Sequence, residues 1–271
     1  SLSGDGGDEI FGGYNRYLAT QNLWRYLAFF PVLFRKFASK GILKIPPKDW
    51  DKVGKIFQNF IGINNFGDKM HKGADVLAAG SSDDLYLKLT SHWENPELLV
   101  LGSSKTSNLL QEYLNKLQGL NQINKMMVVD MLTYLPNDIL TKVDRAAMSF
   151  SLETRVPFLN HKIVEFSSSL PTSLKLRKGT SKWILRQVLY RYVPPELIER
   201  PKAGFSVPLN DWLKGSLRDW AEELLDENLM KQEGFFEVKQ IRNKWSEHLS
   251  GRRNWEHHLW DVLMFQSWLR N

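Results

Sequence analysis

The first residues of the chain combine glycines and carboxylates in a spacing that suits phosphate chemistry. The sequence opens SLSGDGGDEIFGGY, so glycines alternate with Asp5 and Asp8 before an apolar run begins at Ile10. Successive glycines let backbone amides converge on an anion, and a following helix N-terminus adds its dipole. Carboxylates beside such amides repel phosphate unless a divalent cation such as Mg²⁺ bridges the two. The residues alone fit equally well a tight turn that caps a helix.

A second set of chemically useful residues lies in the block LTYLPNDILTKVDRAAMSFSLETRVPFLN, residues 132–160. Its first part carries an apolar stripe at helical spacing, which predicts a helix. The stripe consists of Ile139, Leu140, Val143 and Ala147. In a helix buried on most sides, Asp144 and Arg145 need partners of opposite charge elsewhere. Because Pro157 disfavours a helical residue before it, we expect the helix to end there and Asn160 to cap the next helix.

A third candidate is Lys202, in the segment RPKAGF at residues 200–205. Proline and glycine restrict the conformations of this loop, so its lysine is held in place better than one on a free helix surface. Such a lysine can act as a point charge against phosphate. From the residues alone, a solvated loop lysine is the simpler interpretation.

Most of the remaining sequence has helical periodicity. Residues 22–40 predict a helix, and the apolar cluster at residues 26–34, which contains Pro31, predicts either a core helix or a bent helix pair. Strand signals are limited to residues 2–3 and 173–176. The carboxyl-terminal helices are rich in tryptophan, which we expect to find in the core.

The composition excludes several classes of protein. The 271 residues are 42% hydrophobic and contain no cysteine, which indicates a globular core and excludes disulfides and cysteine-bound zinc. The net charge of +6 favours anionic partners, but the basic residues are scattered, and we expect no nucleic-acid partner. No apolar run has the length of a membrane span, so we expect no membrane partner. The absence of cysteine suits a reducing compartment, and we expect a cytoplasmic protein.

Both ends and the middle of the chain resemble one family. The opening LSGDGGDE followed by FGGY is similar to the second nucleotide loop of glutamine-dependent asparagine synthetases. The block LPNDILTKVDRAAMSFSLETRVPFL is close to the signature of that family, and RPKAGF resembles its catalytic lysine loop. The resemblance implies a mainly α fold: the helical carboxyl-terminal portion of an α/β adenine-nucleotide α-hydrolase-like (PP-loop) synthetase domain, with at most a remnant of its parallel sheet. It also implies a nucleotide and magnesium loop with the first helix at residues 1–20, a helical connection at 21–120 and a helical core at 121–271.

The resemblance implies a chemistry that uses ATP and Mg²⁺. The side-chain carboxylate of aspartate would become β-aspartyl-AMP with release of pyrophosphate, and ammonia derived from glutamine would displace AMP to give asparagine. Ser3 and Gly4 would bind the nucleotide through their backbone. Asp8 would be a ligand of Mg²⁺.

Three more residues take roles from the same resemblance. Asp5 would lie at the acyl-adenylate, where many relatives have the longer glutamate. Glu153 would support proton handling near the acyl group, or would pair structurally with Arg155. Lys202 would stabilise pyrophosphate and the transition state of adenylation.

Two motifs of the family do not occur in the chain. The pyrophosphate loop S-G-G-x-D-S is absent from the sequence, and so is the nucleophilic cysteine of the glutaminase domain. We therefore expect a fragment of a larger enzyme, inactive by itself, whose glutaminase domain and PP-loop lie outside these residues; a homodimer is left open. Two alternatives also stay open. One is a related amidotransferase that acts on another carboxylate, such as a sugar acid of a surface polysaccharide, and the other is a helical binding module without catalysis.

Overall fold

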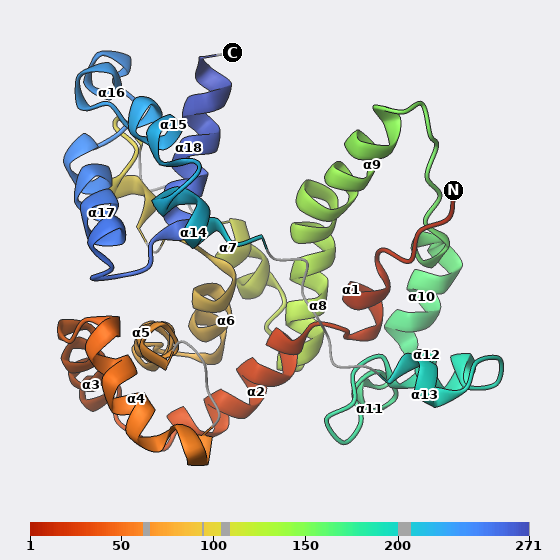
Figure 1. Cartoon of the computed structure of the whole chain (residues 1–271). Coiled ribbons are helices and arrows are strands. Elements are labelled where there is room, and N and C mark those ends of the chain that lie inside the picture. The colour runs from red at the N-terminus through yellow and green to blue at the C-terminus, as the bar shows by residue number, and fades with distance from the viewer. Residues whose placement is uncertain (62–65, 94, 104–108, 200–206, 271) are drawn as a thin grey trace. The chain divides into compact units, whose positions relative to one another are not determined.

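The computed structural model is built almost entirely of helices (Figure 1). It describes residues 1–61, 66–93, 95–103, 109–199 and 207–270, without the side chains of residues 55–61. The chain divides into two compact units. Unit 1 comprises Ser1–Phe29, Ser81–Leu87 and Ser107–Ala203, and unit 2 comprises Phe30–Gly80, Lys88–Thr106 and Gly204–Asn271.

Unit 1 is organised around α8. In Figure 1, α8 continues through a π-helical segment (η2) into α9 as one long rod. The helices of this unit are α1 Gly7–Phe11, α2 Asn15–Leu27, α7 Leu109–Lys116, α8 Gln122–Leu132, η2 Leu135–Leu140, α9 Thr141–Met148, η3 Pro157–Leu159, α10 His161–Ser169, α11 Thr172–Lys175, α12 Trp183–Leu189 and α13 Pro195–Ile198. A further helix, α6 (Ser82–Thr90), begins in unit 1. The core consists of Tyr17, Tyr86, Leu114, Ile123, Met126, Met127 and Val129.

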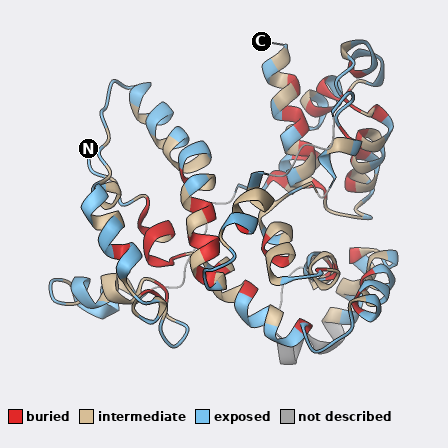
Figure 2. Cartoon of the chain, turned by 180° about the vertical axis from the view of Figure 1, so that it is seen from behind, coloured by how far each residue is buried: buried red, intermediate tan, exposed pale blue. Residues whose placement is uncertain are grey.

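Unit 2 has its core among the carboxyl-terminal helices. Its helices are α3 Val32–Lys44, α4 Pro47–Ile61, α5 Phe66–Leu77, η1 Pro96–Leu98, α14 Leu209–Lys214, α15 Arg218–Leu224, α16 Glu227–Glu233, α17 Val238–Ser250 and α18 Glu256–Leu269. Figure 2 shows buried residues along α1 and α8 of unit 1 and along these last helices, whereas α9 is exposed or half-buried over its length.

Local sequence signals set several of the helix ends. The side chain of Asn121 accepts a hydrogen bond from the Asn124 amide (2.9 Å) at the start of α8. Asn160 accepts from the Lys162 amide (3.0 Å) at the start of α10, which confirms the predicted cap. Glycine marks the carboxyl-terminal end of another helix. Helix α17 ends at Gly251, whose φ of 68° lies in the left-handed region that glycine adopts without steric cost.

The apolar segment around Pro31 forms a helix pair, as one of the two interpretations predicts. A single helix over residues 22–40 is wrong, because α2 ends at Leu27 and Pro31 occupies the N-cap position of α3. The expectation of a core helix is also wrong. Tyr26 and Phe34 are both exposed.

The two predicted strand segments have different outcomes. Residues 2–3 are extended, and Leu2 forms an isolated parallel bridge with Arg155. Residues 173–176 are not a strand, because Thr172–Lys175 forms α11. Within the described residues, β-structure is confined to isolated bridges, so the mainly α class is confirmed.

The tryptophans of the carboxyl-terminal helices are only partly core residues. Trp245 and Trp255 are buried in the core of unit 2, as expected. Trp268 is exposed over 71% of its surface, and for this residue the expectation is wrong. Among the helices that the structure describes, none has the length and apolar character needed to cross a membrane.

Candidate nucleotide-binding site

Two segments that are far apart in the sequence meet at the start of the site. The Ser3 amide donates to the Arg155 carbonyl (2.9 Å), and the Arg155 amide donates to the Ser1 carbonyl (2.9 Å). Such parallel pairing requires extended backbone in both segments and a long connection between them. It places the glycine loop beside the block that contains Glu153.

The loop turns sharply at Gly6 and enters α1 at Gly7. Gly6 has a φ of 79°, and a Cβ on this residue would lie 2.4 Å from Leu159 Cδ2. A Cβ on Gly7 would lie 3.3 Å from the ring of Phe158. The PFL segment of the downstream block therefore packs directly against the loop. Glycine at position 6 supplies both the backbone conformation and the space for this approach.

The first carboxylate of the loop is held by the first hydroxyl. Ser3 Oγ donates a hydrogen bond to the Asp5 carboxylate. Between these residues, a Cβ built on Gly4 meets no atom within 4 Å. The space beside Gly4 is thus open, and a ligand can reach the backbone there.

The second carboxylate is paired with a cation. Lys182 Nζ lies 2.8 Å from Asp8 Oδ2, and the side chains are 30% and 36% exposed. Gly13 packs against both, because a Cβ there would lie 1.8 Å from Asp8 Oδ1 and 2.4 Å from Lys182 Cε. Lys182 has a φ of 52°, an uncommon conformation for a residue with a side chain, and it occupies the N-cap position of α12. The fold thus holds a carboxylate and an ammonium together at the base of the loop, and both are partly open to solvent.

A buried glutamate follows the loop and connects it to an aromatic cluster. Glu9 accepts a hydrogen bond from the Tyr14 hydroxyl (2.6 Å). Burial raises the pKa of Glu9, although the bond from Tyr14 opposes this shift. The guanidinium of Arg16 lies 4.0 Å from the ring centroid of Tyr14 and 4.8 Å from that of Tyr134. These contacts fix the start of α2 relative to the loop.

Asp130 in α8 is the buried anion that balances Arg16. Its Oδ2 lies 2.8 Å from Arg16 Nη2, and its carboxylate accepts from the hydroxyls of Tyr17 and Tyr86 at 2.6 Å each. Burial and the adjacent carboxylate raise the pKa of both tyrosines, so the hydroxyls stay protonated and donate. Three donors surround one buried charge, as a buried carboxylate requires.

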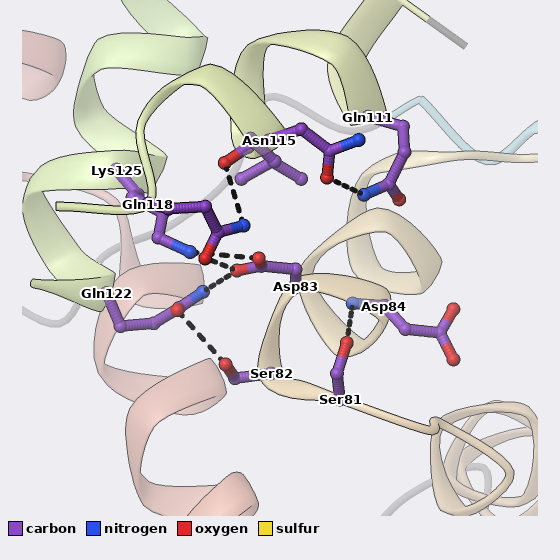
Figure 3. A network of polar contacts seen from close by, with 10 residues as sticks. Ser81, Ser82, Asp83, Asp84, Gln111, Asn115, Gln118, Gln122 and Lys125 are labelled. Carbon is purple, nitrogen blue, oxygen red and sulfur yellow. Dashed lines mark hydrogen bonds and ion pairs between the residues drawn. The ribbon is translucent and has the colours of Figure 1, made fainter. Parts of the chain in front are cut away.

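Asp130 with Arg16, Tyr17 and Tyr86 forms a polar cluster, called the buried hub below. Helices α6 and α8, which carry Tyr86 and Asp130, are joined by further polar contacts (Figure 3). In α8, Lys125 Nζ lies 2.9 Å from Asp83 Oδ2, and the side-chain amide of Gln122 donates to Asp83 Oδ1 (2.9 Å). Asp83 stands in the first turn of α6, and the Tyr86–Asp130 bond joins the same two helices further along. The position of Asp130 is therefore fixed by three polar contacts between α6 and α8.

The side chain of Glu153 pairs with Arg155 and not with a residue of the glycine loop. Glu153 Oε1 lies 2.5 Å from Arg155 Nη2, and the side chains are 70% and 76% exposed. The structural pairing expected as one interpretation of Glu153 is thus present, and its role in proton handling stays a prediction. Lys202 lies outside the described residues, and its approach to phosphate also stays a prediction.

The expected pairing of two charges in the downstream block is wrong. Asp144 and Arg145 are exposed, because α9 has no buried residue and its apolar stripe is only half-buried. Solvated charges need no partner. One ion pair near these residues instead joins Lys142 to Asp138, with 2.7 Å between Nζ and Oδ2.

A metal ion fits this site only together with phosphate. The described part of the chain holds no group of three or more His, Cys, Asp or Glu side chains that could bind a metal ion. Asp8 offers one carboxylate, already paired with Lys182. Mg²⁺ at phosphate-handling sites uses one or two protein carboxylates, because the substrate phosphates supply further ligands. Asp8 suits that arrangement, whereas a site made by these side chains alone does not fit.

Unit 1 thus combines an open glycine loop, the carboxylate of Asp8 paired with Lys182, and a buried polar cluster around Asp130. The family model described as "Asparagine synthase" matches residues 1–270. The chain belongs to the asparagine synthase family. The resemblance drawn from the motifs is confirmed.

Relatives with curated names agree with this family. The chain is similar to asparagine synthetase [glutamine-hydrolyzing] 1 of Bacillus subtilis, with 29% identity over 282 aligned residues that cover 99% of this chain and 40% of the relative. A putative asparagine synthetase [glutamine-hydrolyzing] of Mycobacterium bovis is 28% identical, covering 98% and 38%. The mouse asparagine synthetase [glutamine-hydrolyzing] is 31% identical over 44% of this chain. The chain spans about two-fifths of the length of the bacterial relatives. No solved structure matches it significantly.

Proposed function

We propose that this chain forms one side of the ATP site in a glutamine-dependent asparagine synthetase. The observation that carries the proposal is the Asp8–Lys182 pair on an open glycine loop, in a chain of the asparagine synthase family. A carboxylate and an ammonium side by side suit the phosphate chain of ATP, where one contacts a bound cation and the other contacts oxygen anions directly.

The proposed reaction has two steps. An oxygen of the aspartate side-chain carboxylate attacks the α-phosphorus of ATP, the bond to the α–β bridging oxygen breaks, and pyrophosphate leaves with the electron pair. Ammonia from glutamine then attacks the acyl carbon of β-aspartyl-AMP. The bond from that carbon to the AMP oxygen breaks, AMP leaves, and the nitrogen loses a proton to give asparagine.

The glycine loop would position the nucleotide and the acyl group. Ser3 and Gly4 would face the nucleotide through their backbone, which the open space beside Gly4 supports. Asp5 would lie near the acyl-adenylate, and the hydrogen bond from Ser3 restricts the directions that its carboxylate can take. Fixing these groups before the reaction reduces the entropy lost in the transition state.

Two lysines would stabilise the charge that develops on pyrophosphate. Lys182 is held at the base of the loop by Asp8 and by its N-cap position on α12. Lys202, in the RPKAGF segment, would add a second preorganised charge. Mg²⁺, when bound with ATP, neutralises phosphate oxygens, and Asp8 would be its ligand from this chain.

Glu153 would act near the ammonia. The parallel contact between Leu2 and Arg155 keeps the segment of Glu153 beside the loop. An exposed carboxylate beside the loop would accept the proton that the attacking nitrogen releases.

The same parallel bridge supports the proposed fold. A PP-loop synthetase domain has a parallel sheet, and the Leu2–Arg155 bridge has the hydrogen-bond pattern of two neighbouring parallel strands. The rest of the sheet, the S-G-G-x-D-S loop and the glutaminase domain would come from residues outside this chain. Residues 1–20, 21–120 and 121–271 would be the loop, the connection and the helical core of that domain.

The test is product analysis with the full-length protein. We expect AMP, pyrophosphate and asparagine in equal amounts from ATP, aspartate and glutamine. Formation of AMP with a sugar acid but not with aspartate would instead assign the relative that amidates another carboxylate. The 271 residues alone should form no AMP, because one side of the site is missing from them. AMP formation by this chain alone would place the whole ATP site within it.

A further inference from the structure

Helix α3 in unit 2 has the reverse orientation of an ordinary amphipathic surface helix: polar side chains face the protein interior, and apolar side chains face solvent. Its buried residues are Arg35 and Ser39. Its large apolar side chains, Leu33, Phe34 and Phe37, are 69%, 65% and 75% exposed. A surface helix of a globular protein normally buries its apolar stripe and exposes its charges.

The orientation of α3 is fixed by hydrogen bonds of the buried arginine. Arg35 Nη1 donates to the carbonyls of Leu77 (3.1 Å) and Ala79 (2.6 Å), at the end of α5 and just beyond it. Its Nε donates to the Phe30 carbonyl (3.1 Å), at the start of α3. Rotating α3 to bury its phenylalanines would remove all three bonds and leave backbone carbonyls unpaired. The outward direction of the apolar face is therefore built into the fold.

The exposed apolar side chains lie close together on the surface of α3. Leu33, Phe34 and Phe37 are separated by one, three and four positions, so they share one side of the helix, and Phe30 (56% exposed) precedes them by one turn. Isolated exposed hydrophobic residues need no explanation, but a contiguous cluster of this kind marks an interaction site.

Lysines accompany the cluster along α3, and the stretch of chain that contains them has no acidic residue. Lys36, Lys40 and Lys44 are exposed in the same helix. Residues 10–48 contain no aspartate or glutamate at all. The exposed face of α3 thus combines bulky apolar side chains with lysines and carries no acidic residue of its own.

We propose that α3 is an interfacial helix that docks onto an anionic lipid surface. Leu33, Phe34 and Phe37 insert at the boundary between headgroups and acyl chains, and Lys36 and Lys40 contact lipid phosphates. The positive charge of the lysines distinguishes a lipid surface from an apolar protein partner. A lipid surface accepts apolar side chains and lysines side by side, whereas a purely apolar protein partner leaves the lysines without counter-charge. The sequence predicted no membrane partner because it lacks a span, but interfacial binding needs none.

Vesicle flotation of the full 271-residue chain tests the proposal. We expect the chain to float with vesicles of equal parts phosphatidylcholine and phosphatidylglycerol, and to stay behind with phosphatidylcholine alone. The triple variant K36E/K40E/K44E should lower the partition coefficient at least about 100-fold, because each lysine near an anionic surface contributes about fivefold. Phe37→Ser should lower it about tenfold, because the ring no longer enters the interface.

The matched control is Tyr192→Ser, which removes an aromatic ring that is 80% exposed in unit 1. It should float like the parent chain, and circular dichroism of each variant checks that the helices persist. Equal binding to both kinds of vesicle, or an equal loss in Tyr192→Ser and Phe37→Ser, would overturn the proposal. Absence of flotation together with a dimer that Phe37→Ser dissociates would also overturn it, and would assign the face to a second copy of the chain.

Discussion

Lys182 holds Asp8 at 2.8 Å across the base of the glycine loop, and Gly13 leaves room for this contact. The two charged residues come from the first and the last sequence segments of unit 1. Their pairing gives the loop a cation before any ligand arrives. A ligand that carries both a metal ion and phosphate oxygens can engage each partner separately, and this is the basis of the Mg-ATP site that we propose.

Gly13→Ala tests whether the pair depends on this close approach. The new Cβ would lie 1.8 Å from Asp8 Oδ1, so the carboxylate must move away from Lys182. We expect a loss of about 1–3 kcal/mol in unfolding free energy, measured by urea titration, and weaker Mg-ATP binding by the full-length protein. Gly73→Ala is the control, because a Cβ on Gly73 meets nothing within 4 Å. Equal behaviour of the two variants would show that the pair is not tightly packed.

Lys202→Ala tests the proposed charge on pyrophosphate. In the full-length protein we expect kcat to fall with little change in the KM for ATP, by an amount corresponding to about 2–4 kcal/mol, because the lysine acts on charge that develops in the transition state. Lys202→Arg should restore little, since a planar guanidinium does not replace a point charge. Lys162→Ala, at an exposed lysine of α10, controls for the loss of one positive charge. An increase in KM with kcat intact would contradict the role.

Asp130→Asn tests the buried hub beneath the loop. Removing the charge of the buried Asp130 leaves the half-buried Arg16 without its counter-ion, and we expect unit 1 to lose about 3–5 kcal/mol in unfolding free energy. Tyr86→Phe should cost about 1 kcal/mol, because it removes one hydrogen bond. The control is Asp49→Asn, which breaks the exposed pair with Lys52 and should cost less than about 1 kcal/mol. Similar losses at Asp130 and Asp49 would contradict a buried hub.

His248 makes the stability of unit 2 depend on pH. The side chain is fully buried, and its Nδ1 accepts from the Trp255 amide (3.2 Å). Burial, with a smaller effect of Lys214, lowers the pKa of His248 from 6.5 to about 4. The unfolded chain therefore binds a proton that the folded chain does not bind between these values, so stability is lost as the pH falls from 6.5 to about 4.

The measurement for His248 is urea unfolding at about pH 7 and about pH 4, followed by tryptophan fluorescence. We expect the parent chain to lose about 3 kcal/mol more than His248→Gln on acidification, because glutamine keeps an acceptor but does not titrate. The difference between the two proteins isolates this histidine from the other titrating groups. Parallel pH profiles would show that His248 is not buried in its neutral form.

Local sequence signals predicted the features that depend on neighbouring residues. The glycine-rich opening allowed for a tight turn, which the structure places at Gly6, Asn160 predicted a cap, and residues 2–3 predicted extended backbone. Lys182 was not found, because its partner Asp8 is distant in sequence and a basic residue near a glycine has no distinctive pattern.

The apolar residues around Pro31 show a second limit of prediction from sequence. Helical periodicity predicts that Leu33 and Phe37 share a face, but it does not state whether that face points inward. The direction is decided by hydrogen bonds from Arg35 to carbonyls beyond its own helix. A pattern within one helix carries no information about such contacts.

The decisive measurement is aspartate-dependent exchange of labelled pyrophosphate into ATP by the full-length protein and its Asp8→Asn variant, across a Mg²⁺ titration. The amide keeps the size of the side chain but removes its charge, so both the metal and Lys182 lose their anionic partner. We expect exchange to require aspartate, and we expect Asp8→Asn to lower its maximal rate about 100-fold and to raise the Mg²⁺ concentration for half-maximal exchange. Exchange by Asp8→Asn at the parental rate, with the same dependence on Mg²⁺, would show that Asp8 only shapes the loop and that ATP binds elsewhere.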